Sequence, residues 1–246
     1  GTKERYKPIK KETTAKKKTH PLKTIKILCR NKYFILITLA FAVIYTSLGL
    51  TGGSRIYYAK YVLGDEMLNS TMTMFNYIPT ILTIMLIPVF TKRFGKIKAL
   101  FVGFLFYAAG LVLEIAGPVN LPMIYTGLVL QGIGHAALYS CLFAIVGDVV
   151  DYSEWKDGIR EEGITYSVTS FGQKIGTGLG TAALGWILAA GHYDGTAAVQ
   201  SASAIFAIKG LFLYLPLVIT VIVLIIWYLF MGIDKIYPTV RKELDE

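Results

Sequence analysis

LFLYLPLVITVIVLIIWYLFM, residues 211–231, contains no charged side chain and decides the fold class. A hydrocarbon core about 30 Å thick is crossed by roughly 20 apolar residues in a helix, so this stretch predicts a transmembrane span. The whole chain has the same character. Of its 246 residues, 54% are hydrophobic and only 17% are charged, which is too apolar for the surface of an ordinary soluble domain.

Five further stretches extend the prediction to six membrane-spanning helices. They cover residues 33–50, 72–90, 99–117, 121–146 and 164–190. Pro79 and Pro88 inside the second stretch predict a kink, and the glycines at 49, 52 and 53 are expected to loosen the chain after the first. The fifth stretch is the most polar, which predicts a face toward a pore. We therefore expect an all-α membrane protein with a six-helix domain over residues 33–232.

The basic residues fall mainly on one side of this layout. If the six spans are correct, 21 of the 25 lysines and arginines lie on the side of both termini and three on the other, with Lys174 inside a span. The positive-inside rule then places both termini in the cytoplasm of a multi-pass cell-membrane protein. Residues 1–32 are expected to be a basic cytoplasmic segment and residues 233–246 a cytoplasmic tail. Because the basic residues flank apolar stretches, the net charge of +9 predicts a lipid bilayer and no nucleic acid as partner.

A charged segment separates the fourth and fifth stretches, where we expect an inter-helix loop on the cytoplasmic side. It is Gly147-Asp148-Val149-Val150-Asp151-Tyr152-Ser153-Glu154-Trp155-Lys156, and it continues through Arg160 to Gly163. This segment resembles the signature of the glycoside-pentoside-hexuronide:cation symporter family of the major facilitator superfamily, which includes the melibiose, lactose and xyloside permeases. Thr91-Lys92-Arg93-Phe94-Gly95-Lys96 is similar to the turn between helices two and three of a major facilitator half, although ordinary positive-inside charge explains it equally well. Thr2-Lys3-Glu4-Arg5 resembles the family sequence just after helix six.

The resemblance covers essentially the whole chain, as helices seven to twelve of a twelve-helix permease. It implies a fragment that corresponds to the C-terminal half, built from 3+3 inverted repeats, with residues 1–32 as the central loop and an N-terminal six-helix half as partner. It also implies secondary transport of a sugar or glycoside coupled to Na⁺ or H⁺, with no cofactor. In the charged segment, Asp148, Asp151 and Arg160 become candidates for a cytoplasmic gate that pairs with charges of the other half. The alternative is a solvated turn.

Two helices carry the candidate substrate contacts. In the fourth stretch, Gln131, His135 and Tyr139 are four residues apart and share a face. Either they line a cavity, or His135 and Gln131 hydrogen-bond neighbouring helices while Tyr139 fills the core; for His135 and Gln131 we favour the second. The resemblance implies a sugar contact at Tyr139, where the melibiose permease has tryptophan.

In the fifth stretch, glycines at 172, 176 and 180 predict close packing against another helix. Lys174 points away from that seam and shares a polar face with Ser170. It lies near the membrane midplane, where an ammonium costs at least about 2.5 kcal/mol on insertion scales unless it is paired or faces water. The resemblance implies that Lys174 lies beside the cation and sugar sites; a structural salt bridge between the halves is the alternative.

Arg55 and Glu114 are the other charges near membrane depth, and we expect both to snorkel to the outer interface, with Arg55 kept as a weaker site candidate. No nucleophile-base constellation, phosphate loop or metal-ligand spacing is present in the sequence, so we do not predict an enzyme or a metal site. A lipid or lysolipid carrier, and a membrane half-protein that acts only as an assembly partner, remain alternative functions.

Overall fold

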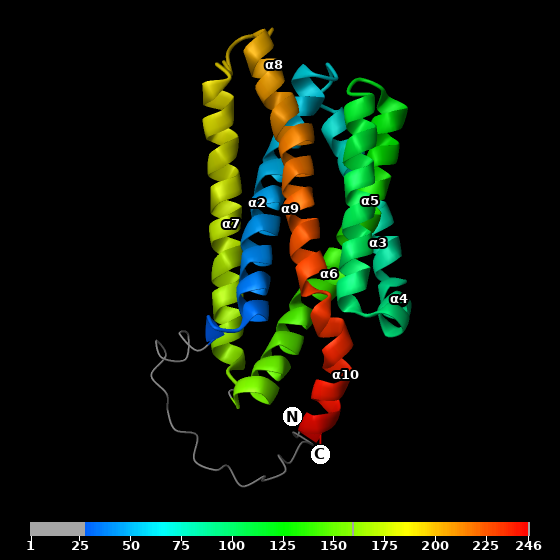
Figure 1. Cartoon of the computed structure of the whole chain (residues 1–246). Helices are drawn as coiled ribbons and strands as arrows, with labels where there is room; N and C mark the ends of the chain where they lie inside the picture. Colours follow the sequence, from blue (N-terminus) through cyan, green and yellow to red (C-terminus); the bar gives the residue numbers. More distant parts are fainter. Residues whose placement is uncertain (1–27, 159, 246) are drawn as a thin grey trace, which may run out of the picture.

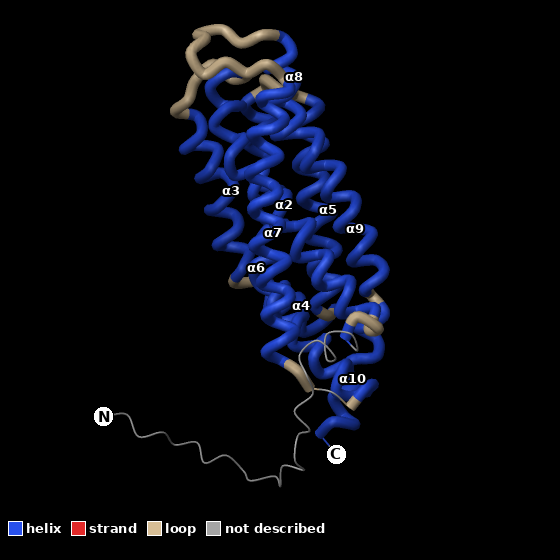
Figure 2. The backbone as a smooth tube through the Cα atoms, turned by 90° about the vertical axis from the view of Figure 1, so that its left-hand side faces the viewer, coloured by secondary structure: helices blue, strands red, loops and turns tan. Residues whose placement is uncertain are grey.

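The computed structural model describes residues 28–158 and 160–245, and within them every regular element is helical. The long helices run side by side along one axis (Figure 1), and Figure 2 shows helices and loops throughout the described chain. The elements are α2 (Lys32–Tyr61), α3 (Leu68–Ile84), α4 (Ile87–Phe94), α5 (Lys96–Ala116), α6 (Leu121–Asp157), α7 (Glu162–Ala190), α8 (Ala202–Lys209), the π-helix η1 (Gly210–Tyr214), α9 (Leu215–Phe230) and α10 (Gly232–Asp245). The all-α prediction is confirmed. Thr2-Lys3-Glu4-Arg5 and most of the predicted basic segment lie outside the described residues.

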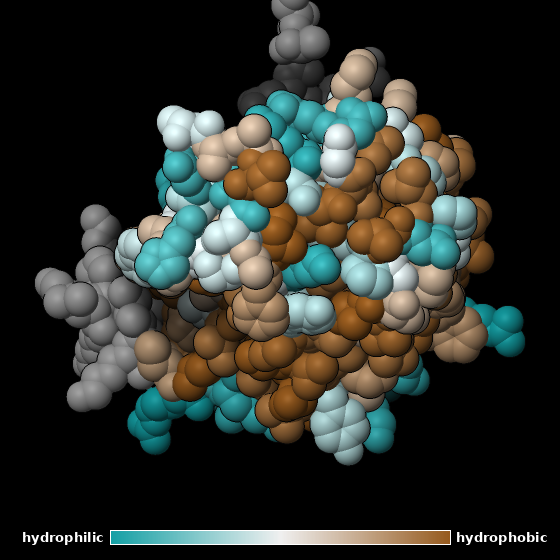
Figure 3. Space-filling model, turned by 90° about the horizontal axis from the view of Figure 1, so that it is seen from above, coloured by the Kyte–Doolittle hydropathy of each residue, from teal (hydrophilic) through white to brown (hydrophobic). Residues whose placement is uncertain are grey.

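Four of the described helices are long and apolar enough to cross a membrane: α2, α5, α6 and the helix that covers residues 202–244. The bent pair α3 and α4 would be a fifth. Helix α7 does not meet the same apolar test although it is 29 residues long, because serines, threonines and Lys174 crowd its first half. Seen from above in Figure 3, hydrophobic areas occupy much of the visible face, with hydrophilic groups among and around them. The structure therefore supports a multi-pass membrane protein.

The kink predicted from Pro79 and Pro88 is present. Helix α3 ends at Ile84, and α4 starts at Ile87 at an angle of 55°. Proline has no backbone N–H and is tolerated in the first turn of a helix, where Pro88 stands, rather than in its interior. The break thus falls just before Pro88, while Pro79 is accommodated inside α3.

The first helix continues past the point where the glycines were expected to loosen it. Helix α2 runs through Gly49, Gly52 and Gly53 to Tyr61. A Cβ at Gly49 would lie 2.7 Å from the carbonyl oxygen of Thr177 on α7, and one at Gly53 would lie 2.6 Å from the side chain of Leu184. At these two positions glycine permits close helix contact, so the predicted loosening is wrong.

The charged segment that follows residue 146 is helical, which corrects the predicted loop. Helix α6 continues to Asp157 and ends at Gly158, whose φ of 66° is the left-handed conformation that favours glycine. No helix breaker stands between Gly147 and Gly158, and the two aspartates are buried against basic partners rather than solvated. The alternative of a solvated turn is therefore wrong as well.

The last span also begins earlier than predicted. Ser201 caps α8 by accepting a hydrogen bond from the backbone N–H of Ala204, and the helix passes through Lys209 and η1 into α9. The predicted tail is the helix α10, which packs on the far end of α6. In Figure 1 the start of α2 and the helix α10 lie at the same end of the bundle.

Helices α2 and α7 pack along each other, as do α5 and α6, while α9 contacts both α2 and α5. Gly172, Gly176 and Gly180 are buried and lie against the backbone carbonyls of Thr38, Ala42 and Thr46 on α2. The close packing predicted for this glycine seam is confirmed. It orients α7, so that Lys174 on its other side remains exposed.

We expect Gly176→Ala to destabilise the protein by about 1–3 kcal/mol, because the new methyl group would collide with the Ala42 carbonyl oxygen and force α2 and α7 apart. The matched control is Gly178→Ala, two residues away, where a Cβ meets nothing within 4 Å. Thermal unfolding of the two variants in detergent measures the difference. Equal midpoints would show that the seam does not hold the pair together.

Candidate functional site

Gln131 and His135 hydrogen-bond neighbouring helices. The side chain of Gln131 is 5% exposed, and its Nε2 donates to Glu114 Oε1 on α5 at 2.7 Å. His135 Nδ1 lies 3.4 Å from Asn76 Oδ1 on α3, and its ring lies 5.0 Å from that of Tyr107. These are the helix-packing contacts that we favoured for both residues. A direct substrate role for either stays a prediction.

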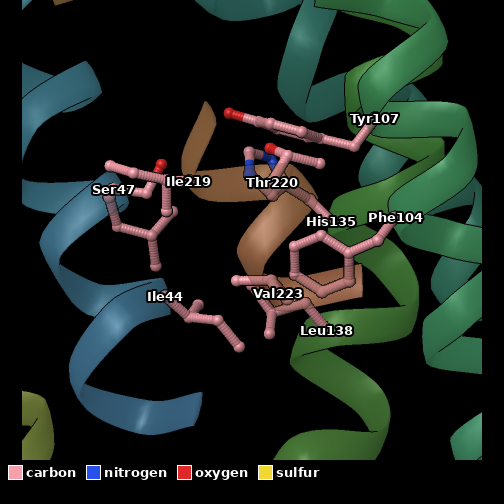
Figure 4. Close-up of a pocket in the computed structure, with 10 residues that line it drawn as sticks. Ile44, Ser47, Phe104, Tyr107, His135, Leu138, Ile219, Thr220 and Val223 are labelled. Atoms are coloured by element: carbon pink, nitrogen blue, oxygen red, sulfur yellow. The ribbon is translucent and has the colours of Figure 1, made fainter. Parts of the chain in front are cut away.

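The cavity beside His135 is too small for a sugar. Figure 4 shows its lining, with Tyr107 and His135 on one side, Ser47 and Ile44 of α2 on the other, and residues of α9 between them. Its volume is about 20 Å³. Because a water needs about 10–15 Å³ of such space, the cavity holds roughly one water molecule. A sugar contact in this region would therefore have to come from the exposed face of the bundle.

Tyr139 stands on that exposed face. Its side chain is 46% exposed, and its ring centroid lies 5.8 Å from that of His135. The alternative that Tyr139 fills the core is therefore wrong. An exposed tyrosine offers a flat ring for stacking and a hydroxyl for hydrogen bonding, which are the contacts that a sugar requires.

Lys174 lines an open recess on α7 together with Ser170, Phe171 and Tyr166. It makes no hydrogen bond or ion pair with any residue that the structure describes. The hydroxyl of Thr177, one turn further along, bonds the carbonyl of Gln173 on its own helix. Lys174 is thus an exposed cation in the middle of a long helix.

The two candidate contacts belong to adjacent helices. Tyr166 on α7 donates a hydrogen bond to the Phe143 carbonyl of α6 at 3.4 Å. Tyr139 lies one helical turn from Phe143, and Ser170 lies one turn from Tyr166. Within the described residues, no hydrogen bond or ring contact joins Tyr139 to Lys174. Helices α6 and α7 therefore meet at Tyr166 and Phe143, one turn closer to the α10 end of the bundle. At Tyr139 and Lys174 no such contact joins the two helices in the described part of the chain.

At the end of the bundle that carries α10, Asp148 is paired inside this chain. Lys96 Nζ donates to both carboxylate oxygens of Asp148, at 2.6 and 2.9 Å. The Asp148 side chain is 8% exposed and that of Lys96 is 34% exposed. Lys96 starts α5 and belongs to the basic turn singled out in the sequence, but its pairing with Asp148 could not be found from spacing alone.

Asp151 and Arg160 are also paired within the chain. Arg160 Nη1 lies 3.1 Å from Asp151 Oδ1, and Tyr237 of α10 donates a hydrogen bond to Asp151 Oδ2 at 2.9 Å. Arg160 bonds Glu154 and Glu162 as well, and these hydrogen bonds raise the pKa of its guanidinium, so it stays a cation. The partners of the predicted gate residues thus lie on α5, α6, α7 and α10 of the same chain.

Glu114 does not snorkel, which corrects the prediction. Its side chain is 0% exposed and lies between α5 and α6, because Gly127 leaves room for it. Arg55 is half-buried, and its Nη1 donates to Thr73 Oγ1 on α3 at 3.1 Å. Helix counting placed both residues near the outer interface but could not show which way they point.

The helical bundle, its apolar spans and its exposed polar face define a multi-pass membrane protein. The family model described as "MFS/sugar transport protein" matches residues 1–235, and the chain belongs to this family. Its members are transporters and not enzymes, and they need no cofactor. The resemblance stated from the charged segment is confirmed.

Three relatives illustrate the match. An isoprimeverose transporter of Lactiplantibacillus pentosus is 32% identical over all of this chain and 50% of its own length. A putative 2,3-dihydroxypropane-1-sulfonate exporter of Salmonella typhimurium is 28% identical over all of the chain and 53% of its length. A putative glycoside/cation symporter of Escherichia coli is 25% identical over 78% of the chain and 42% of its length. The chain spans about half the length of these relatives.

Removing Lys96 should destabilise the protein more than removing Asp148. Lys96→Gln leaves a buried carboxylate without its partner, which costs up to about 3–5 kcal/mol, whereas Asp148→Asn leaves a lysine that reaches solvent. Thermal unfolding in detergent compares the two, with Glu66→Gln in the exposed pair with Lys60 as control. The prediction is contradicted if Lys96→Gln lowers the unfolding midpoint no more than Asp148→Asn does.

Proposed function

We propose that this chain forms the C-terminal half of a twelve-helix transporter that moves a sugar or glycoside together with Na⁺ or H⁺. The observation that carries the proposal is Lys174, an exposed cation about halfway along α7 with no partner among the described residues. A lysine at that depth cannot face lipid cheaply, so the face that carries it has to be covered by protein or water. The names of the glycoside-transporting relatives support the substrate class.

A second six-helix half covers this face in the proposal. Lys174 sits 11 residues beyond Gly163, which at 1.5 Å per residue is about 16 Å along the helix and near the bilayer midplane. Substrate and ion sites of such transporters lie at this depth, between the two repeats. That relatives are about twice as long as this chain supports the presence of a partner half.

Each candidate residue then has a role. Tyr139 stacks on or hydrogen-bonds the sugar, and Ser170 offers a hydroxyl from the recess beside Lys174. Lys174 pairs with an acidic residue of the other half beside the cation site. Gln131 and His135 hold α6 against its neighbours and position Tyr139 rather than touch the sugar. Asp148, Asp151 and Arg160 form the cytoplasmic gate with their partners in this half.

The proposed layout has six spans in a cell membrane, built as 3+3 inverted repeats, with both termini in the cytoplasm. The positive-inside distribution and the shared end of α2 and α10 support it. Helix α7 counts as a span because its 29 residues nearly match the 30 of its packing partner α2.

Single cysteines at His192 and Thr239 test this topology, since they lie in the loop after α7 and in α10. We expect an impermeant thiol reagent to label residue 192 from outside the cell and residue 239 only after the membrane is opened. Cys29 and Cys141 are first replaced by serine. Equal labelling of both sites from outside would contradict the topology.

Lys174→Gln in the transporter that carries this chain should abolish cation-driven sugar accumulation and leave expression intact, because the acidic partner proposed in the other half loses its positive counter-charge. Lys209→Gln, at the far end of the last span, is the matched control and should transport normally. Uptake of a labelled glycoside into proteoliposomes with and without an ion gradient makes the comparison. Normal accumulation by the Lys174 variant would refute the role.

A further inference from the structure

A buried carboxyl group outside the proposed sugar face has no assigned role. Glu114 of α5 is 0% exposed, and a Cβ at Gly127 of α6 would lie 2.6 Å from Glu114 Cγ and 3.0 Å from Glu114 Oε1. Any side chain larger than hydrogen at position 127 would therefore take the space of the carboxyl group. Helices α5 and α6 therefore leave a space that the carboxyl group of Glu114 fills.

The hydrogen bonds around Glu114 do not suit an ionised carboxylate. Its Oε1 accepts one bond, from Gln131 Nε2 at 2.7 Å, and its Oε2 is buried with no partner. An ionised carboxylate accepts hydrogen bonds on both oxygens, and an isolated one inside a protein is costly enough that the group neutralises instead. A protonated carboxyl avoids most of this cost.

The groups that face Glu114 supply no donor to Oε2. Tyr58 of α2 donates its hydroxyl to the carbonyl of Pro118, and Tyr107 of α5 packs on the ring of His135. Both interact with Glu114 electrostatically, while Tyr214 of η1 interacts with Tyr58. From α6 only the amide of Gln131 reaches the carboxyl group. None of these side chains is a cation.

Arg55 of α2 is the one cation in the described residues that interacts with Glu114, but it forms no ion pair with it here. Its Nη1 bonds Thr73, and its Nε is buried with no partner. Within the described chain, Glu114 Oε2 is thus a buried acceptor without a donor, and Arg55 Nε is a buried donor without an acceptor.

We propose that Glu114 is a proton-binding site of this half: the buried carboxyl group holds a proton in the conformation described, and approach of Arg55 releases it to water. Release converts the carboxylic acid to a carboxylate, and the guanidinium supplies the donor that Oε2 lacks. The site is separate from Lys174 and does not rest on the proposed sugar transport. It is connected to the exposed face through α6, because Gln131, His135 and Tyr139 follow one another at single turns.

Infrared spectroscopy of the full-length protein in detergent tests the protonation directly. The difference spectrum between the unaltered protein and Glu114→Gln at pH 7 should show the C=O stretching band of a protonated carboxyl group, and Glu66→Gln, at an exposed carboxylate, should not. Labelling glutamate with ¹³C assigns the band in the unaltered protein, so the test survives a variant that fails to fold. Carboxylate bands in place of the C=O band overturn the proposal.

The role of Arg55 is tested by titrating the same band with pH in Arg55→Met. Without the guanidinium, the band should persist to a higher pH than in the unaltered protein, since no donor is left to stabilise the carboxylate. Lys60→Met, one to two turns further along α2 and exposed, is the control and should leave the titration unchanged. An unchanged titration in Arg55→Met overturns the release step.

Discussion

Inside a bilayer no water is available to a polar group, so every amide, hydroxyl and charge at membrane depth needs a partner from protein or from a hydrated cavity. This constraint accounts for most of the structure. Glycines bring α7 against the carbonyls of α2, and hydroxyl groups such as that of Thr177 bond their own helix. Lys174 is an exposed exception, and its exposure on the described chain is the reason to expect a second protein surface over that face.

The end of the bundle that carries α10 meets the same constraint with charge pairs. Lys96 and Arg160 neutralise Asp148 and Asp151, and α10 contributes the hydroxyl of Tyr237 to the second aspartate. Because these pairs are already formed within the described chain, the proposed gate would open by an exchange of partners rather than by exposing bare charges. The tail helix therefore takes part in the charge pairing at this end and is more than a solvated extension.

The sequence was sufficient for the fold class, the kink at Pro88 and the glycine seam, because apolar length, proline and small-residue spacing act locally. Prediction from the sequence failed where the conformation of a residue depends on the helix that packs against it. Gly49 was expected to loosen the helix, but it lets α2 pack against Thr177. Glu114 was expected to snorkel, but Gly127 leaves space for its carboxyl group between α5 and α6. The segment after residue 146 was expected to be a loop because its charged residues were taken to be solvated. Lys96, 52 residues away in the sequence, instead pairs with Asp148 inside the bundle. Helix spacing and the family resemblance singled out Tyr139 and Lys174 as candidates, but the structure was needed to show that no contact in the described chain joins them between α6 and α7.

Uptake of glycosides by proteoliposomes tests the central claim, that the face of Lys174 is completed by another half. The protein would be prepared as this chain alone and as this chain joined to an N-terminal half. The account predicts ion-driven accumulation of a glycoside only for the joined protein, since the site is walled by both halves. Accumulation by the chain alone at a comparable rate would contradict it.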